Sequence, residues 1–286
     1  MTTSKTPSNI SIKPYRMDFE FSDAIPQYWA YNDPFMTHFV GALSTFFPDG
    51  ERFFIDSVRH FRDTVKDDKV RQQEIAGFIG QEAHHSKEHE SLNHFMEKRG
   101  LPALSGANAA LTLLNWGRRK FPPRTRLAAT VSLEHFTAIL ANRLLSHPEF
   151  MSHIDDSIKP LWMWHAIEET EHKAVAFDLY KDVKGNNHKE LVFTMVMATA
   201  LLAGTTALYQ VRFMAKDGQL FNIKSWAFGL NKLFGRQGLI SGLIPDYLDF
   251  FKEDFHPWDH ANSELVQYWR ARLDAEMDKL KLLKAA

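Results

Sequence analysis

The sequence contains no cysteine among its 286 residues. Disulfides, thiolate metal sites and cysteine nucleophiles are therefore excluded. Any metal site has to be built from histidine, aspartate and glutamate, which are common ligands of zinc, iron and manganese. The chain also lacks a charge excess, because 34 basic and 35 acidic side chains leave a formal net charge of −1. No nucleic-acid partner is expected, since nucleic-acid binding needs a concentrated basic patch.

The first thirty residues lack the apolar core of a signal peptide. They are polar and are interrupted by Pro7, Pro14 and Pro26. Together with the missing cysteines, this favours a cytoplasmic location. The apolar content of 44% and the charged content of 24% are those of an ordinary globular protein, and we expect a single domain over residues 1–286.

Alternating strand patterns of useful length are missing too, whereas helical periodicity recurs along most of the chain. Asp33 before Pro34 predicts the start of a helix that ends near residue 47, where Pro48-Asp49-Gly50 interrupts it. A second helix is expected from about Glu51. Further helices are predicted over 69–99, 107–121, 122–146 and 157–183, with several short helices in the tail. The predicted fold class is all-α.

The residues that carry chemistry are two Glu-x-x-His pairs, Glu82 with His85 and Glu169 with His172. Residues three apart lie on one face of a helix, so each pair presents a carboxylate and an imidazole together. The pattern alone is weak evidence. A third pair, Glu253 with His256, stands before Pro257 at a predicted helix end and looks like a chance occurrence.

The spacing of four glutamates is more specific than either pair. Glu51 precedes Glu82 by 31 residues, Glu134 follows Glu82 by 52, and Glu169 follows Glu134 by 35. Four separate helices thus supply one glutamate each, and two of them add a histidine, as in di-iron carboxylate bundles. The predicted metal ligands are Glu51, Glu82, His85, Glu134, Glu169 and His172.

Three segments carry a closer resemblance: Phe47-Pro-Asp-Gly-Glu-Arg-Phe-Phe, Gln81-Glu-Ala-His-His-Ser-Lys-Glu-His and Trp164-His-Ala-Ile-Glu-Glu-Thr-Glu-His-Lys. The ligand pattern resembles the ferritin-like di-iron superfamily. These segments resemble, more narrowly and over nearly the whole chain, a bacterial family of predicted metal-dependent hydrolases. The fold that this implies is a ferritin-like antiparallel four-helix bundle over residues 33–184. Additional N-terminal helices and a helical C-terminal extension over 185–286 complete it.

Two more histidines lie in phase with the ligand faces. His165 precedes Glu169 by four residues, and His89 follows His85 by four. Each is expected to be either an additional ligand or a hydrogen-bond partner of the ligands.

The reaction stays open between alternatives. Carboxylate-rich sites with two imidazoles suit iron, manganese or a mixed pair better than zinc. We expect two iron ions that activate O2 to oxidise or oxygenate a small, apolar molecule, for example a lipid-like one. The alternative, which the family resemblance implies, is a hydrolase with a hydroxide shared by two metal ions. A non-enzymatic metal-binding bundle is the third hypothesis.

Residues 191–211 contain no charged side chain and are long enough to cross a bilayer. One interpretation is a helix buried centrally or packed in a dimer interface through its small residues. The other is attachment to or insertion into a membrane. A homodimer is the expected assembly.

Overall fold

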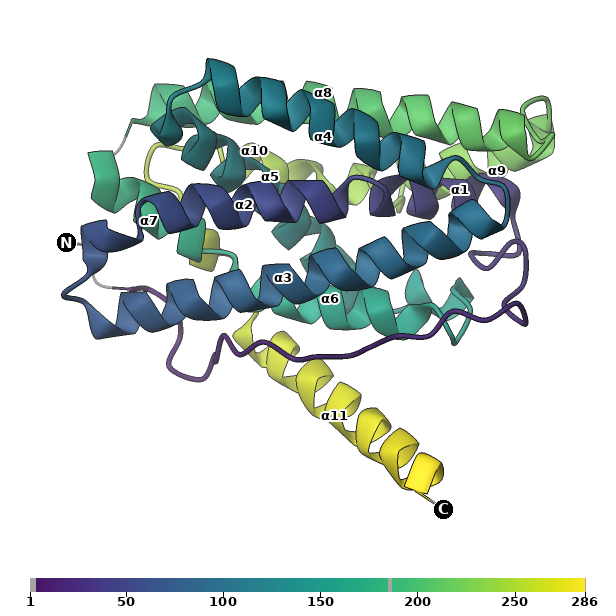
Figure 1. The fold of residues 1–286 in the computed structure, drawn as a ribbon, viewed down its shortest axis with the longest axis horizontal. Helices are drawn as coiled ribbons and strands as arrows, with labels where there is room; N and C mark the ends of the chain where they lie inside the picture. The colour runs from purple at the N-terminus through teal and green to yellow at the C-terminus, as the bar shows by residue number, and fades with distance from the viewer. Residues whose placement is uncertain (1–3, 185–186, 286) are drawn as a thin grey trace.

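The computed structural model describes residues 4–184 and 187–285 (Figure 1). Over these residues the regular structure is helical, which confirms the all-α prediction, and one isolated antiparallel bridge joins Ala30 to Ile154. The α-helices are α1 (Pro34–Ser44), α2 (Phe47–His60), α3 (Lys69–Lys98), α4 (Ala103–Lys120), α5 (Pro123–Ser146), α6 (Lys159–His172), α7 (Val175–Lys184), α8 (His188–Lys216), α9 (Ile223–Phe234), α10 (Ile244–Asp249) and α11 (Ser263–Ala285). Short 3₁₀ turns cover Arg62–Val65, Met151–His153, Ser241–Leu243 and Pro257–Asp259.

Most of the helix starts and ends in the structure lie where the sequence predicts them. The Asp33 carboxylate accepts a hydrogen bond of 3.0 Å from the Met36 amide, so Asp33 caps α1 as predicted. α3 is followed by Gly100, whose φ of 86° lies in the left-handed region that glycine favours. The expected interruption at Pro48 is wrong, because this proline lies in the first turn of α2, where its missing amide hydrogen costs nothing.

The long helix predicted over 157–183 is divided in two. α6 ends at His172 and α7 begins at Val175, with Lys173 and Ala174 forming a turn between them. The Lys173 ammonium group donates hydrogen bonds to the His260 carbonyl and the Asn262 side chain. The turn thus follows directly on a predicted metal ligand and ties it to the C-terminal part of the chain.

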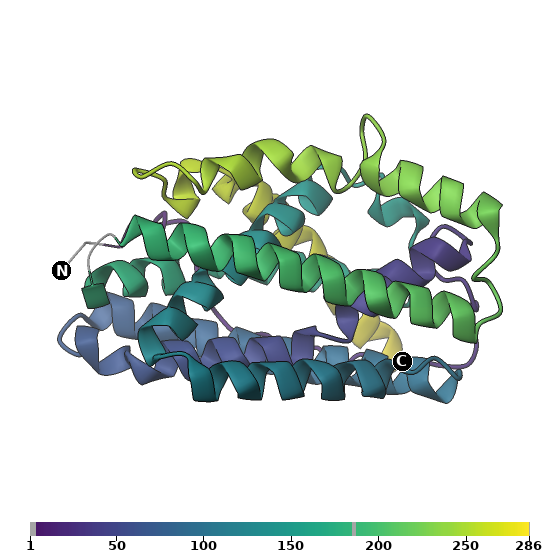
Figure 2. The ribbon, with the colours of Figure 1, turned by 90° about the horizontal axis from the view of Figure 1, so that it is seen from above.

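Four helices enclose the centre of the molecule. α2 packs on α3, α3 on α6, α6 on α5 and α5 on α2, which closes a ring of four. α4 covers α2 and α5 from outside, and α8 lies against α1 and α5 on the same side of the molecule (Figures 1 and 2). α11 contacts α5 and α6 and extends away from the ring (Figure 1).

The apolar core consists of two clusters with a polar centre between them. One cluster contains Trp164 and the other contains Phe78, and both side chains are fully buried. The Trp164 ring lies edge-on to His85 at 4.8 Å, and the Phe78 ring lies edge-on to His172 at 4.9 Å. Each aromatic ring thus packs against the ring of one predicted ligand.

The N-terminal arm runs along α3 (Figure 1). Its close approach depends on two glycines, since a Cβ at Gly77 would lie 2.3 Å from the Ile12 carbonyl oxygen and one at Gly80 2.3 Å from Pro14 Cγ. The boundary expected at 184–185 falls next to residues 185–186, which lie outside the described residues. The single-domain organisation stays a prediction.

Within the described residues, α8 is long and apolar enough to cross a membrane, and it is the one helix for which this holds. Only 28% of its most apolar window is buried, so α8 is not a central core helix. Phe193, Val196, Met197 and Leu208 are each more than half exposed on it. These side chains give α8 an exposed apolar face.

Candidate metal centre

The four glutamates predicted from spacing converge inside the helix ring. Glu51 lies on α2, Glu82 on α3, Glu134 on α5 and Glu169 on α6, and each is at most 3% exposed. Carboxylates are rarely buried unless they are paired or bind a cation. Their convergence is therefore a strong indication of a cation site.

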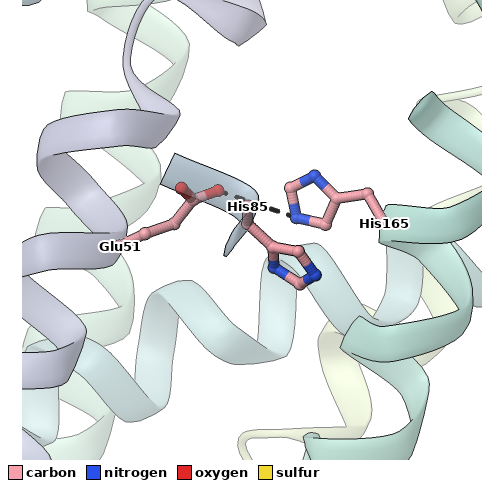
Figure 3. Close-up of side chains that lie close together, drawn as sticks. All are labelled: Glu51, His85 and His165. Atoms are coloured by element: carbon pink, nitrogen blue, oxygen red, sulfur yellow. Dashed lines mark ion pairs between the residues drawn. The ribbon is translucent and has the colours of Figure 1, made fainter. Parts of the chain in front are cut away.

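The first group of candidate ligand atoms belongs to Glu51, His85 and His165, within 4.8 Å of one another (Figure 3). His165 Nε2 lies 3.7 Å from Glu51 Oε1 and 2.8 Å from Glu169 Oε1. His85 Nδ1 lies 3.4 Å from the same Glu169 oxygen. This group therefore contains two imidazoles, where the sequence pattern leads one to expect one.

The second group consists of Glu82, Glu134, Glu169 and His172, again within 4.8 Å. His172 Nε2 lies 3.0 Å from Glu82 Oε1, 3.4 Å from Glu134 Oε2 and 3.6 Å from Glu169 Oε2. Glu169 therefore turns one oxygen towards each group. A carboxylate in this position can bridge two metal ions.

The buried polar atoms that lack hydrogen-bond partners show whether this centre fits metal ions. Buried polar atoms normally have hydrogen-bond partners, and leaving one unpaired costs about 1–3 kcal/mol or more for a charged group. At this centre the buried atoms without a hydrogen-bond partner are both carboxylate oxygens of Glu51, Glu82 and Glu134, Glu169 Oε2, His85 Nδ1 and His172 Nε2. These atoms belong to the six predicted ligand residues.

The pKa shifts of these residues also indicate a cation site. Burial raises the pKa of Glu51, Glu82 and Glu134 well above the usual value, and neighbouring carboxylates raise it further. Burial is the largest single influence on the pKa of His172 and lowers it, but the charge and hydrogen bond of Glu169, together with the Glu134 and Glu168 charges, raise that pKa to about 9. A metal-free centre must therefore hold several extra protons, which divalent cations would replace.

Hydrogen bonds behind two of the histidines orient their metal-facing nitrogens. His85 Nε2 donates to Glu168 Oε2 at 3.1 Å, so its Nδ1 faces the centre. His172 Nδ1 donates to Gln81 Oε1 at 2.9 Å, so its Nε2 faces the centre. Such partners fix the tautomer and the ring orientation of metal-binding histidines.

His165 and His89 form one hydrogen-bonded chain. Ser44 donates to Asn93 Oδ1 at 3.0 Å, so it accepts from His89 Nδ1 at 2.9 Å. His89 Nε2 is then an acceptor, and His165 Nδ1 donates to it at 2.7 Å. His165 Nε2 then has a lone pair 2.8 Å from a carboxylate oxygen of Glu169, so a proton or a metal ion has to lie between the two atoms. The geometry places His165 among the candidate ligands and His89 behind it.

Sequence reasoning missed the outer residues. The Trp164 indole donates to Glu168 Oε1 at 2.9 Å, and Gln81 Nε2 donates to Glu171 Oε2 at 2.8 Å. Arg270 on α11 donates to Glu171 Oε1 from two nitrogens, at 2.8 and 3.0 Å. Gln81, Glu168 and Glu171 stand within the segments that carry the family resemblance, which could have drawn attention to them. Arg270 carries no such signal.

The third Glu-x-x-His pair does not contribute. His256 Nε2 lies 2.9 Å from Asp178 Oδ1, on the α7 side of the molecule, and His256 belongs to neither candidate group. The interpretation of this pair as a chance occurrence agrees with its position.

A comparison with protein-family models places the chain. A family model described as a predicted metal-dependent hydrolase matches residues 13–261. The chain belongs to this family. The matched range includes all residues of the two candidate groups. Neither a curated protein nor a solved structure matches the chain significantly.

Membership of the metal-dependent hydrolase family corrects one expectation. The prediction of O2 activation by an oxidoreductase is wrong, and the alternative, metal-dependent hydrolysis, is the one that the family supports. The error has a physical reason, because bridged carboxylate sites serve both chemistries and the ligand residues alone do not choose. The family and the buried residue groups together support metal ions as cofactors.

Proposed function

We propose that this metal-dependent hydrolase uses two divalent metal ions to cleave an ester with water. The observation that carries the proposal is the pair of candidate groups joined by Glu169, whose buried ligand atoms lack hydrogen-bond partners. Two ions held by these residues would supply Lewis-acid chemistry, making a water molecule more acidic and polarising the bond to be cleaved. Iron and manganese remain the proposed metals, and the third imidazole, His165, adds zinc as a candidate.

The chain's own residues have distinct parts in this proposal. Glu51, His85 and His165 would hold one ion, and Glu82, Glu134 and His172 the other, with Glu169 shared. Glu168 and Gln81 orient His85 and His172 through the hydrogen bonds described above. The surrounding aromatic rings exclude bulk water from the centre, which strengthens its electrostatic interactions.

Charge balance favours an uncharged substrate. Four carboxylates cancel the charge of two divalent ions, so the loaded centre is neutral when its histidines are neutral. No arginine or lysine lines the pocket that reaches Glu51 and Glu169. A phosphate dianion would find no compensating charge there, whereas a carboxylic ester needs none.

Several finer assignments belong to the same proposal. A ferritin-like bundle is supported by the four ligand helices that close into a ring. Membrane attachment through 191–211 is supported by the exposed apolar side chains of α8. A small-molecule substrate and a homodimer stay predictions, and a mass measurement in solution tests the latter.

The test is hydrolysis by defined metal-loaded forms. The chelator-treated protein is loaded with Fe(II) under anaerobic conditions, Mn(II) or Zn(II), and then given p-nitrophenyl acetate or p-nitrophenyl phosphate. We expect metal-dependent turnover of the acetate, lost in Glu134→Gln and retained in Glu20→Gln, a matched change at an exposed glutamate. Equal rates with and without metal, or in both variants, would overturn the proposal.

A further inference from the structure

A pocket leads from the surface beside α8 to the metal centre. About 90 Å³ of it is open to the centre of a water-sized molecule, and part of the pocket faces solvent. Its inner end is formed by Glu51 of the first candidate group and Glu169 of the second, whose Oε1 also lies 2.8 Å from His165. A molecule in the pocket would therefore place one end against the metal centre.

The walls of this pocket are apolar. They come from four helices, with side chains such as Phe47 and Phe54 on α2, Leu113 on α4, Leu133 on α5 and Leu202 on α8. Two threonines also line it, but their hydroxyls are already used. Thr137 donates to the Glu134 carbonyl and Thr205 donates to the Leu201 carbonyl. A polar group inserted between these walls would lose its hydration without gaining a partner.

We propose that this pocket holds the hydrocarbon chain of an ester substrate and places the ester group at the metal centre. The assignment names the substrate class and rests on the proposed hydrolase function. In the reaction, the oxygen of water bonds to the carbonyl carbon and the bond to the leaving oxygen breaks. A proton from the water goes to that leaving oxygen, so the products are a carboxylic acid and an alcohol.

The mouth of the pocket shows where the hydrocarbon chain of the substrate would enter. Leu201 lines the pocket and is also 38% exposed on α8. Met197, one turn earlier on the same face of α8, is 54% exposed. The apolar lining thus continues into the exposed apolar face of α8. The ester could come from a dissolved molecule or from a lipid bilayer, and the hydrocarbon chain is common to both.

Gly50 provides a sharp test because it lines the pocket and a Cβ there would meet nothing within 4 Å. Gly50→Leu would fill the space, and leucine also has a higher helix propensity than glycine. Gly204→Leu is the matched control, since Gly204 is helical, is equally free of neighbours and does not line the pocket. Leu113→Trp, with Leu111→Trp on the same helix as its control, is a second pair in case Gly50→Leu does not fold.

The first measurement is binding of octanol to the metal-free protein by calorimetry. Burial of each methylene tightens binding about fourfold, so octanol should bind far more tightly than butanol. Gly50→Leu should weaken octanol binding by about tenfold or more, because it occupies the space of several methylenes. Gly204→Leu should bind like the wild type. Absence of octanol binding, or equal loss in both variants, would overturn the assignment.

The second measurement is hydrolysis by the metal-loaded protein. The ratio of kcat/KM for p-nitrophenyl octanoate to that for the acetate should exceed one and fall about tenfold in Gly50→Leu only. Turnover of phosphatidylcholine in vesicles would identify the bilayer as the source, and turnover of the dissolved ester alone would identify the dissolved molecule. If octanol binds but the metal-loaded protein hydrolyses no ester, the hydrolase function is refuted. The pocket would then still be supported as a binding site for a hydrocarbon chain.

Discussion

Glu134→Gln should stabilise the metal-free protein while weakening its stabilisation by metal. Glu134 is 1% exposed, and both of its carboxylate oxygens lack a hydrogen-bond partner. Burial, together with the Glu82 and Glu169 charges, holds the pKa of Glu134 well above the usual value. Glutamine has the same shape without the ionisation, and its amide can donate a hydrogen bond to a neighbouring carboxylate.

The magnitude follows from proton linkage. Above its usual pKa, Glu134 loses its proton in the unfolded chain but keeps it in the folded one. The folded state is therefore destabilised by about 1.4 kcal/mol for each pH unit until pH passes the folded pKa. Over two pH units the difference amounts to about 3 kcal/mol, and glutamine avoids it. The gain should be absent near pH 4 and present at pH 7.

The assay is urea unfolding of chelator-treated protein at both pH values, with Glu20→Gln as the control. At pH 7 the metal-free Glu134→Gln protein should show the higher free energy of unfolding. Added Mn(II) or Fe(II) should stabilise the wild type more than the variant, which keeps the ligands of the first candidate group. A variant that is less stable than the wild type at pH 7 without metal would refute the reasoning.

Three further predictions concern other parts of the molecule. Arg270→Ala should weaken metal binding about 10–100-fold in a competition with a chelator, because it removes the cation that holds Glu171, whereas Arg272→Ala on the same helix should not. Gly229→Ala should lower the free energy of unfolding by about 1–3 kcal/mol, since its Cβ would lie 1.9 Å from Phe35; equal stability would contradict the packing. Met197→Glu should reduce flotation with lipid vesicles and change the free energy of unfolding by less than about 0.5 kcal/mol; unchanged flotation would argue against membrane attachment.

The all-α fold and the site could be predicted because both leave regular marks on the sequence. The spacing of Glu51, Glu82, Glu134 and Glu169 follows helix length and turn length. It therefore predicts that the four residues lie at one level of the bundle. Gly100 and Asp33 mark helix ends through local backbone chemistry, which also needs no tertiary structure. These features are local or periodic.

Other features depend on contacts between distant segments and left no such mark. Arg270 reaches Glu171 from a helix 99 residues further along the chain. The turn after His172 has no glycine or proline, and its lysine is held by the carbonyl of His260. The ligand residues by themselves could not predict hydrolysis over O2 activation, because the same ligands serve both reactions; only the family resemblance indicated it.

The most direct test of the metal centre is the metal content of the purified protein. Elemental analysis should find about two divalent ions per chain, since there are two candidate groups of ligands. Glu82→Ala should lower this content, and Glu20→Ala should not. A content well below two ions per chain, unchanged by Glu82→Ala, would contradict the assignment of this centre.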